Sequence, residues 1–136
     1  MKRFKFLEHT ADIGLEAYGS NLAEAFANAA YGLFSIITDP AGISEVESCL
    51  VEVNEADAEG LLFEWLNRLV YIFDVELLLF KRFEMVEFNE RHLKARCYGE
   101  KYDPARHHLK MGIKSVTYHQ LTVDSQKNSV RVIFDI

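Results

Sequence analysis

An α+β fold is what this sequence predicts, with two helices packed on one face of a mostly antiparallel sheet in two layers. Two segments space their apolar residues three and four apart, as amphipathic helices do, and several shorter segments alternate apolar and polar residues, as half-buried strands do. The last four strands follow one another without an intervening helix, which favours antiparallel pairing. The predicted strands cover residues 4–8, 12–18, 48–54, 83–88, 92–98, 113–123 and 129–136.

The first predicted helix covers residues 22–38 and has recognisable signals at both ends. Asn21 can cap its first turn, and Glu24 stands at the position that completes a capping box. Pro40 follows the last apolar residue of the pattern, and proline cannot continue a helix. The segment between the second and third strands is therefore a helix with defined bounds.

The second predicted helix covers residues 57–80 and is followed by the remaining four strands and one long loop. Asp57 lies at its start and Lys81 at its end, an order of charges that suits the helix dipole. Residues 99–112 are polar and lack periodicity, so we expect a loop there before the last two strands.

The composition favours a single intracellular domain, residues 1–136, of ordinary globular type. The net charge of −6 argues against strong direct binding of nucleic acid, which usually needs a basic face. Cys49 and Cys97 fit neither a disulfide framework nor a metal motif, and we interpret both as core thiols. The N-terminus lacks a signal peptide and no apolar run is long enough to span a membrane, so we expect a cytoplasmic protein.

His9 and Asp12 stand in a polar segment between the first two predicted strands. Residues three apart on a regular strand point to opposite faces, so these side chains converge only if the chain kinks between them. A converging pair could bind a metal or act in catalysis. The alternative is a local turn, in which the side chains of Thr10 and Asp12 bond to nearby backbone groups.

Asp135 lies one residue before Ile136, so its carboxylate is next to the terminal carboxylate. If the last strand pairs beside the strand that starts at Asp12, three carboxylates meet at one end of a sheet. Clustered like charges raise each other's pKa unless a cation neutralises them, and oxygen ligands favour Ca²⁺ or Mg²⁺. If the two strands are not neighbours, Asp135 is a solvated edge residue.

A basic cluster stands in and around the predicted loop of this acidic chain. It is either a solvated loop or a docking surface for an anion, a nucleotide or an acidic patch on a partner. Its members are Lys101, Arg106, His107, His108, Lys110 and Lys114.

Three separated motifs together resemble the archease family. The resemblance rests on Glu8-His9-Thr10-Ala11-Asp12-Ile13-Gly14, on Gly99-Glu100-x-x-Asp103-x-x-Arg106-His107 followed by Ile113-Lys114-Ser115-Val116-Thr117-Tyr118-His119, and on Val132-Ile133-Phe134-Asp135-Ile136.

This resemblance implies a fold that contains a strand-helix-strand-strand module, and a non-catalytic role in tRNA splicing. Archeases activate the RtcB-type RNA ligase by promoting guanylylation of its active-site histidine, so that ligase is the implied partner. The implied metal ligands are Asp12, Asp135 and the terminal carboxylate of Ile136, holding a divalent cation, Ca²⁺ first, with Mg²⁺ or Mn²⁺ as alternatives. Lys114 matches a functionally important lysine, and His9 is a supporting residue.

Two other functions remain open at this stage. One is a metal-dependent hydrolase with His9 as its base, although the sequence shows neither a second base nor an anchored nucleophile. The other is an RNA-binding or chaperone-like module that uses the loop at residues 99–112, which the acidic balance of the chain disfavours.

Overall fold

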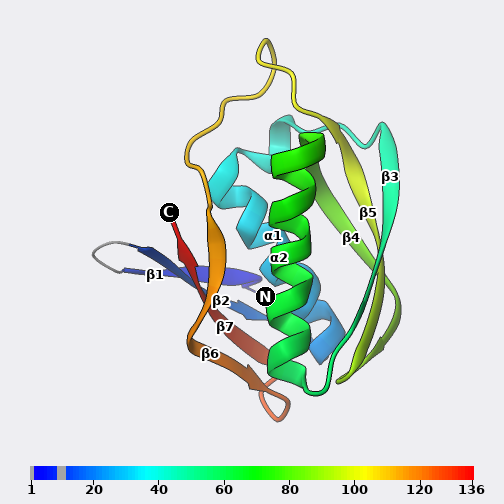
Figure 1. The fold of residues 1–136 in the computed structure, drawn as a ribbon, viewed down its shortest axis with the longest axis vertical. Coiled ribbons are helices and arrows are strands. Elements are labelled where there is room, and N and C mark those ends of the chain that lie inside the picture. Colours follow the sequence, from blue (N-terminus) through cyan, green and yellow to red (C-terminus); the bar gives the residue numbers. More distant parts are fainter. Residues whose placement is uncertain (1, 9–11) are drawn as a thin grey trace.

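The computed structural model describes residues 2–8 and 12–136, and Figure 1 shows the arrangement of its helices and strands. The predicted α+β class and the antiparallel pairing of the strands are confirmed. The elements are β1 Phe4–Glu8, β2 Asp12–Tyr18, α1 Leu22–Ile37, the 3-10 helix η1 Pro40–Gly42, β3 Glu47–Asn54, α2 Ala58–Glu76, β4 Leu78–Asn89, β5 His92–Lys101, β6 Ser115–Asp124 and β7 Ser129–Asp135.

The strands form two sheets, and both helices lie between them (Figure 1). One sheet has the order β1-β2-β7-β6 and the other the order β3-β5-β4. Helix α1 contacts β2 and β4, and α2 contacts β6 and β3, so each helix contacts both sheets. The sequence predicted one sheet with the helices on one face. The difference follows from α1, in which 11 of 16 residues are buried, because a helix that is apolar on most sides needs cover on both.

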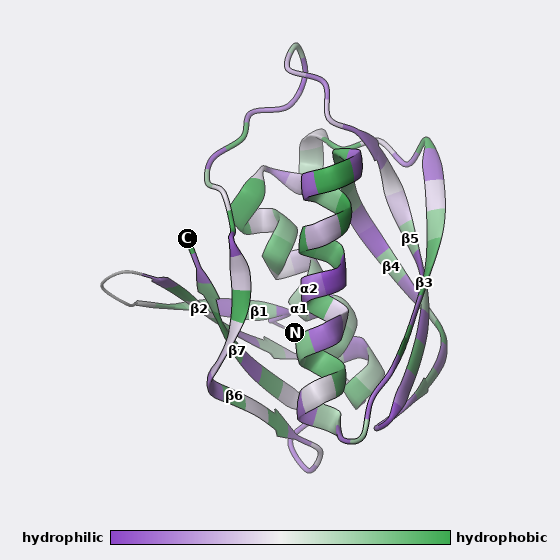
Figure 2. Ribbon diagram, viewed as in Figure 1, coloured by the Kyte–Doolittle hydropathy of each residue, from purple (hydrophilic) through white to green (hydrophobic). Residues whose placement is uncertain are grey.

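The three-stranded sheet comes from one continuous segment, residues 47–101, in the order strand, helix, strand, strand. Its strands alternate hydrophobic and hydrophilic residues, as Figure 2 shows for β4 and β5. Aromatic side chains join this segment to α1, because the ring of Phe34 stacks on Phe83 and the indole N–H of Trp65 donates to the carbonyl of Phe26 at 3.0 Å. This segment fits the module that the family resemblance implied.

Predicted boundaries were wrong at two places in the chain, the passage from α2 to β4, which begins at Leu78 and not at residue 83, and the end of β5. The second helix ends at Glu76 instead of residue 80, because Leu77 adopts a left-handed conformation with φ of 57° and the next residues enter β4. Strand β5 continues to Lys101, so the loop before β6 covers residues 102–114. Gly99 allows this pairing, since a Cβ at that position would collide with the backbone carbonyl of Leu79.

Among the described residues, no helix is both long enough and apolar enough to cross a membrane. Both cysteines are free and lie opposite each other on β3 and β5. Cys97 is fully buried and Cys49 is half-buried, and burial raises the pKa of both thiols. Their placement agrees with the interpretation as core thiols.

Candidate functional site

Asp12 and Asp135 are direct partners in the antiparallel pairing of β2 with β7. Side chains of such partners point to the same face, with Cβ atoms about 4.5–5.5 Å apart. The strand pairing on which the sequence argument depended is therefore confirmed. It joins the start of the second strand to the end of the last one.

A third strand continues this row, because Ser115 at the start of β6 is the partner of Asp135 on the other side. The Ser115 hydroxyl donates to Asp135 Oδ2 at 3.3 Å. Lys114 precedes it, and its backbone N–H donates to the carbonyl of Asp135 at 2.8 Å. Ile136 follows Asp135 in the chain and is 36% exposed. Asp12, Asp135, Lys114 and Ile136 thus lie at one end of the four-stranded sheet.

The oxygen atoms of the side chains in this row suit a hard cation. Asp12 and Asp135 supply carboxylate oxygens and Ser115 a hydroxyl, and such oxygen ligands are what Ca²⁺ and Mg²⁺ prefer. Asp135 is exposed and Asp12 half-buried, so the row is open to solvent on one side. His9, the supporting residue predicted from the sequence, lies outside the described residues.

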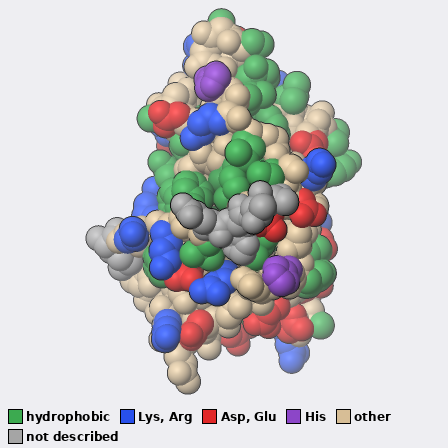
Figure 3. All heavy atoms as spheres, turned by 90° about the vertical axis from the view of Figure 1, so that its left-hand side faces the viewer, with side chains coloured by type: hydrophobic (Ala, Val, Ile, Leu, Met, Phe, Trp, Pro, Cys, Tyr) green, Lys and Arg blue, Asp and Glu red, His purple; other side chains and the backbone are tan. Residues whose placement is uncertain are grey.

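An apolar pocket of about 540 Å³ adjoins Asp12. Figure 3 shows this side of the molecule, where hydrophobic side chains gather and basic and acidic ones surround them. The pocket lies between the β1–β2 hairpin, the end of α1 and the loop before β6. Its lining residues are Phe6, Leu7, Asp12, Ile13, Ser35, Ile36, Lys110 and Met111.

The loop that supplies Lys110 is fastened to the end of α1 at two points. The Thr38 hydroxyl donates to the carbonyl of His108 at 2.7 Å, and the backbone N–H of Lys110 donates to the carbonyl of Ile37 at 2.8 Å. This loop arches from β5 to β6 at the top of Figure 1. Its path decides where Lys110 lies beside the pocket and where Lys114 enters the row at Asp135.

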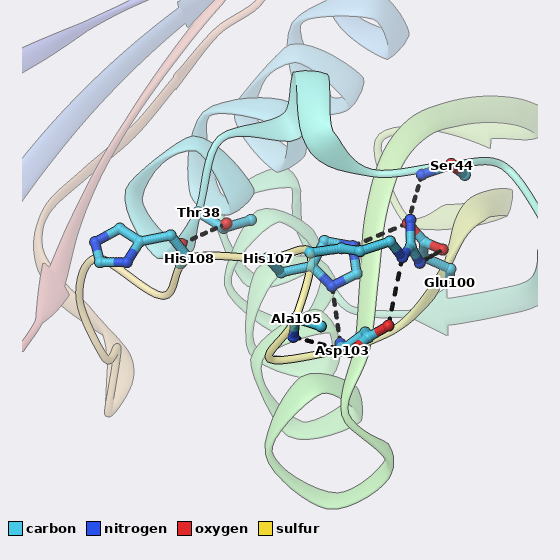
Figure 4. A network of polar contacts seen from close by, with 8 residues as sticks. Thr38, Ser44, Glu100, Asp103, Ala105, His107 and His108 are labelled. Atoms are coloured by element: carbon cyan, nitrogen blue, oxygen red, sulfur yellow. Dashed lines mark hydrogen bonds and ion pairs between the residues drawn. The ribbon is translucent and has the colours of Figure 1, made fainter.

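A buried network at the root of the same loop centres on Glu100 (Figure 4). One carboxylate oxygen of Glu100 pairs with the Arg106 guanidinium. The other accepts from the backbone N–H of Ser44 at 2.7 Å and lies 2.9 Å from His107 Nε2. These donors, Arg106 first, lower the pKa of Glu100 to about 2. Glu100 is therefore a carboxylate that stays ionised inside the protein.

The contacts of His107 fix which of its nitrogens carries a proton. The backbone N–H of Asp103 donates to Nδ1 at 2.9 Å, so Nδ1 is the acceptor and Nε2–H faces Glu100. His107 is 5% exposed, and both of its ring nitrogens take part in these contacts. His107 thus holds two parts of the chain together, the turn at Asp103 and strand β5 at Glu100.

The sequence predicted Arg106 and His107 only as members of a solvated or docking cluster, and this network was not foreseen. For His107 that prediction was wrong, since the side chain is buried. A signal was present: Glu100 and Asp103 stand within seven residues of Arg106 and His107, so acidic and basic groups were available to neutralise one another. Lys101, Lys110 and Lys114 are exposed, as the prediction expected.

Comparison with known proteins agrees with the motifs. Residues 4–136 match the model of the Archease protein family (MTH1598/TM1083). Protein archease of Pyrococcus abyssi is 42% identical over 127 residues, which cover 91% of this chain and 89% of that protein. Protein archease of Sulfurisphaera tokodaii is 39% identical over 130 residues, which cover 94% and 93%.

Solved structures agree as well. The solution structure of protein 1598 from Methanobacterium thermoautotrophicum matches with a TM-score of 0.83 at 34% identity, covering 100% of both chains. A crystal structure of an archease from Thermotoga maritima, described as a possible chaperone, matches with a TM-score of 0.61 at 21% identity, which shows the fold alone. It covers 97% of this chain and 96% of that one. By its motifs, its family match and its relatives, this chain belongs to the archease family.

Proposed function

We propose that this protein activates an RtcB-type RNA ligase in the cytoplasm during tRNA splicing. It would promote guanylylation of the ligase and so restore turnover, without catalysing ligation itself. Membership of the archease family supports this role, as does the resemblance of the three motifs. The observation that carries it is the direct pairing of Asp12 with Asp135, because it gathers the residues of two distant motifs at one end of a sheet.

A divalent cation is the cofactor in this proposal. The ligands would be the side chains of Asp12 and Asp135 and the terminal carboxylate of Ile136. The row formed with Ser115 supports this assignment, since its oxygen donors fit Ca²⁺ first and Mg²⁺ or Mn²⁺ as alternatives. When bound, the cation supplies positive charge and coordination positions that protein side chains leave open.

Lys114 and His9 have different roles in the proposal. Lys114 is exposed and joined through its backbone to Asp135, so its ammonium group is available to an acidic or phosphate group of the ligase complex. His9 would act as a supporting residue. The apolar pocket beside Asp12 offers the partner a hydrophobic contact next to these charges.

The test is multiple-turnover RNA ligation by the ligase with and without this protein. We expect an increase in ligated product and in guanylylated ligase, and a loss of that increase with Asp12→Ala. Glu90→Gln, an exposed turn residue on the other sheet, is the matched control and should activate normally. Equal turnover with and without the protein would contradict the proposal, and normal activation by Asp12→Ala would remove Asp12 from it.

Two further measurements separate the other functions. The purified protein is incubated with Mn²⁺ or Mg²⁺ and with nucleotides or phosphoesters, and hydrolysis without any partner would indicate a hydrolase. Binding of the isolated protein to RNA is measured over a range of salt concentrations. Tight, salt-sensitive binding would indicate an RNA-binding module instead.

A further inference from the structure

A second group of candidate metal ligands lies on the three-stranded sheet, away from Asp12 and Asp135. Glu52 on β3, Glu87 on β4 and His92 on β5 each offer one ligand atom, and these atoms all lie within 4.8 Å of one another. The two glutamates are exposed and His92 is half-buried. One imidazole and two carboxylates from three strands therefore lie close together at one place on the surface.

The contacts of His92 orient its ring toward the two carboxylates. Nδ1 lies 2.7 Å from Asn54 Oδ1, an acceptor, so Nδ1 is the donor in that bond. Nε2 is directed to the opposite side, 2.8 Å from Glu87 Oε1 and 3.6 Å from Glu52 Oε2. A histidine that binds a metal through one nitrogen usually donates its other N–H to an oxygen of the protein, as His92 does to Asn54.

The two glutamates turn toward His92 although a lysine lies closer in the strand register. Lys94 is the direct partner of both Glu52 and Glu87. Within the part of the chain that the structure describes, no ion pair within 4.0 Å joins Lys94 to either of them. Both carboxylates therefore lie at His92, and neither forms a close ion pair with Lys94.

We propose that Glu52, Glu87 and His92 form a site for a first-row divalent cation such as Zn²⁺. Ligands at zinc distances and tetrahedral angles stand about 3.4 Å apart, so the observed 2.8 Å must lengthen by about 0.6 Å and the observed 3.6 Å must shorten by about 0.2 Å. The imidazole distinguishes this site from the all-oxygen row at Asp135, since nitrogen ligands favour zinc over calcium. The proposal is independent of the ligase-activating role.

The experiment is a Zn²⁺ titration of the full chain by calorimetry, in the presence of saturating Ca²⁺ to occupy oxygen-only sites. We expect one equivalent of Zn²⁺ to bind, and His92→Gln and Glu52→Gln each to weaken the affinity at least about tenfold. Glu84→Gln, a carboxylate elsewhere on β4, is the matched control and should leave the affinity unchanged. Unfolding curves of all variants show whether the sheet is intact.

A substitution of Lys94 tests the proposal in the opposite direction, because it should strengthen the binding of Zn²⁺ instead of weakening it. Lys94 is the register partner of both glutamates and its positive charge repels a cation there, so Lys94→Gln should bind Zn²⁺ more tightly, by about threefold or more. The ring signals of His92 in NMR spectra should shift on addition of Zn²⁺. Unchanged affinity in His92→Gln, or Zn²⁺ binding that is lost in Asp135→Asn instead, would overturn the proposal.

Discussion

Glu100 and Asp135 are carboxylates in two of the sequence motifs of this fold, and their surroundings differ sharply. Glu100 is 5% exposed and accepts hydrogen bonds from Arg106, His107 and the backbone N–H of Ser44. Asp135 is exposed and accepts a hydrogen bond from the Ser115 hydroxyl at 3.3 Å. It also stands opposite a second carboxylate, that of Asp12, in the pairing of β2 with β7. One acid is neutralised by the chain itself, whereas the other meets a like charge.

The difference separates a structural acid from a candidate ligand. An ionised carboxylate inside a protein requires donors and a counter-charge, and Glu100 has both. Two carboxylates in direct register are destabilising unless a cation joins them. Motif residues that look alike in the sequence can therefore differ in role: Glu100 fastens a loop, whereas Asp135 is the proposed ligand of a cation.

The largest expected effect concerns the response to calcium. If Asp12 and Asp135 bind the cation, Ca²⁺ at a hundred times its Kd should raise the free energy of unfolding of the wild type by about 2.7 kcal/mol. Asp135→Asn should abolish that gain, and chemical denaturation with Ca²⁺ and with a chelator measures it. Glu100→Gln should keep the gain, and a calcium response that survives in Asp135→Asn would remove the contrast between the two acids.

Glu100→Gln should lower the free energy of unfolding by about 2 kcal/mol, with or without Ca²⁺. The amide cannot accept from three donors as the carboxylate does, and Arg106 loses its counter-charge. Urea unfolding followed by tryptophan fluorescence measures the change, with the exposed turn variant Glu90→Gln as control. Equal stability of the two variants would show that the network contributes little.

The same network predicts a pH dependence. The pKa of Glu100 is lowered from 4.5 to about 2 in the folded protein, so its contribution to stability is present above 4.5 and is lost as the pH falls toward 2. The difference in unfolding free energy between wild type and Glu100→Gln should therefore shrink across that window. Urea unfolding at a series of pH values measures it, and a constant difference would contradict the assignment.

The smallest effect is expected for Ser115→Ala. Its hydroxyl makes one long hydrogen bond to an exposed carboxylate, so we expect a loss of about 0.5 kcal/mol in the presence of chelator. Ser125→Ala, in the exposed turn before β7, is the control. A loss near that of Glu100→Gln would mean that Asp135 is also fastened structurally.

The sequence predicted the elements of this fold better than their arrangement. Hydrophobic periodicity located both helices and all seven strands, because side chains that face a core repeat with the geometry of the element. It could not place the end of α2, since the apolar spacing continues from Phe73 through Leu77 to Phe80 while the backbone turns at Leu77. It also could not divide the strands between two sheets, because pairing partners leave no local pattern.

The candidate site was also predicted only in part. The pairing of the strands that carry Asp12 and Asp135 was a conditional expectation, and it is confirmed. The cation and the role of Ile136 stay predictions. The burial of His107 was out of reach of periodicity, because a loop residue is buried by contacts with Glu100 and Asp103 and not by its place in a repeat.

The pairing of β2 with β7 also sets an order of events for the newly made chain. Its cross-strand bonds include Arg131 with Glu16, 115 residues apart in the sequence, whereas the three-stranded sheet needs residues 47–101 alone. Contacts between residues far apart in the sequence form late, because the chain loses more conformational entropy in forming them. Residues up to Asp135 must have left the ribosome before Asp12 can pair with it, so the proposed ligase-activating site forms later than the three-stranded sheet.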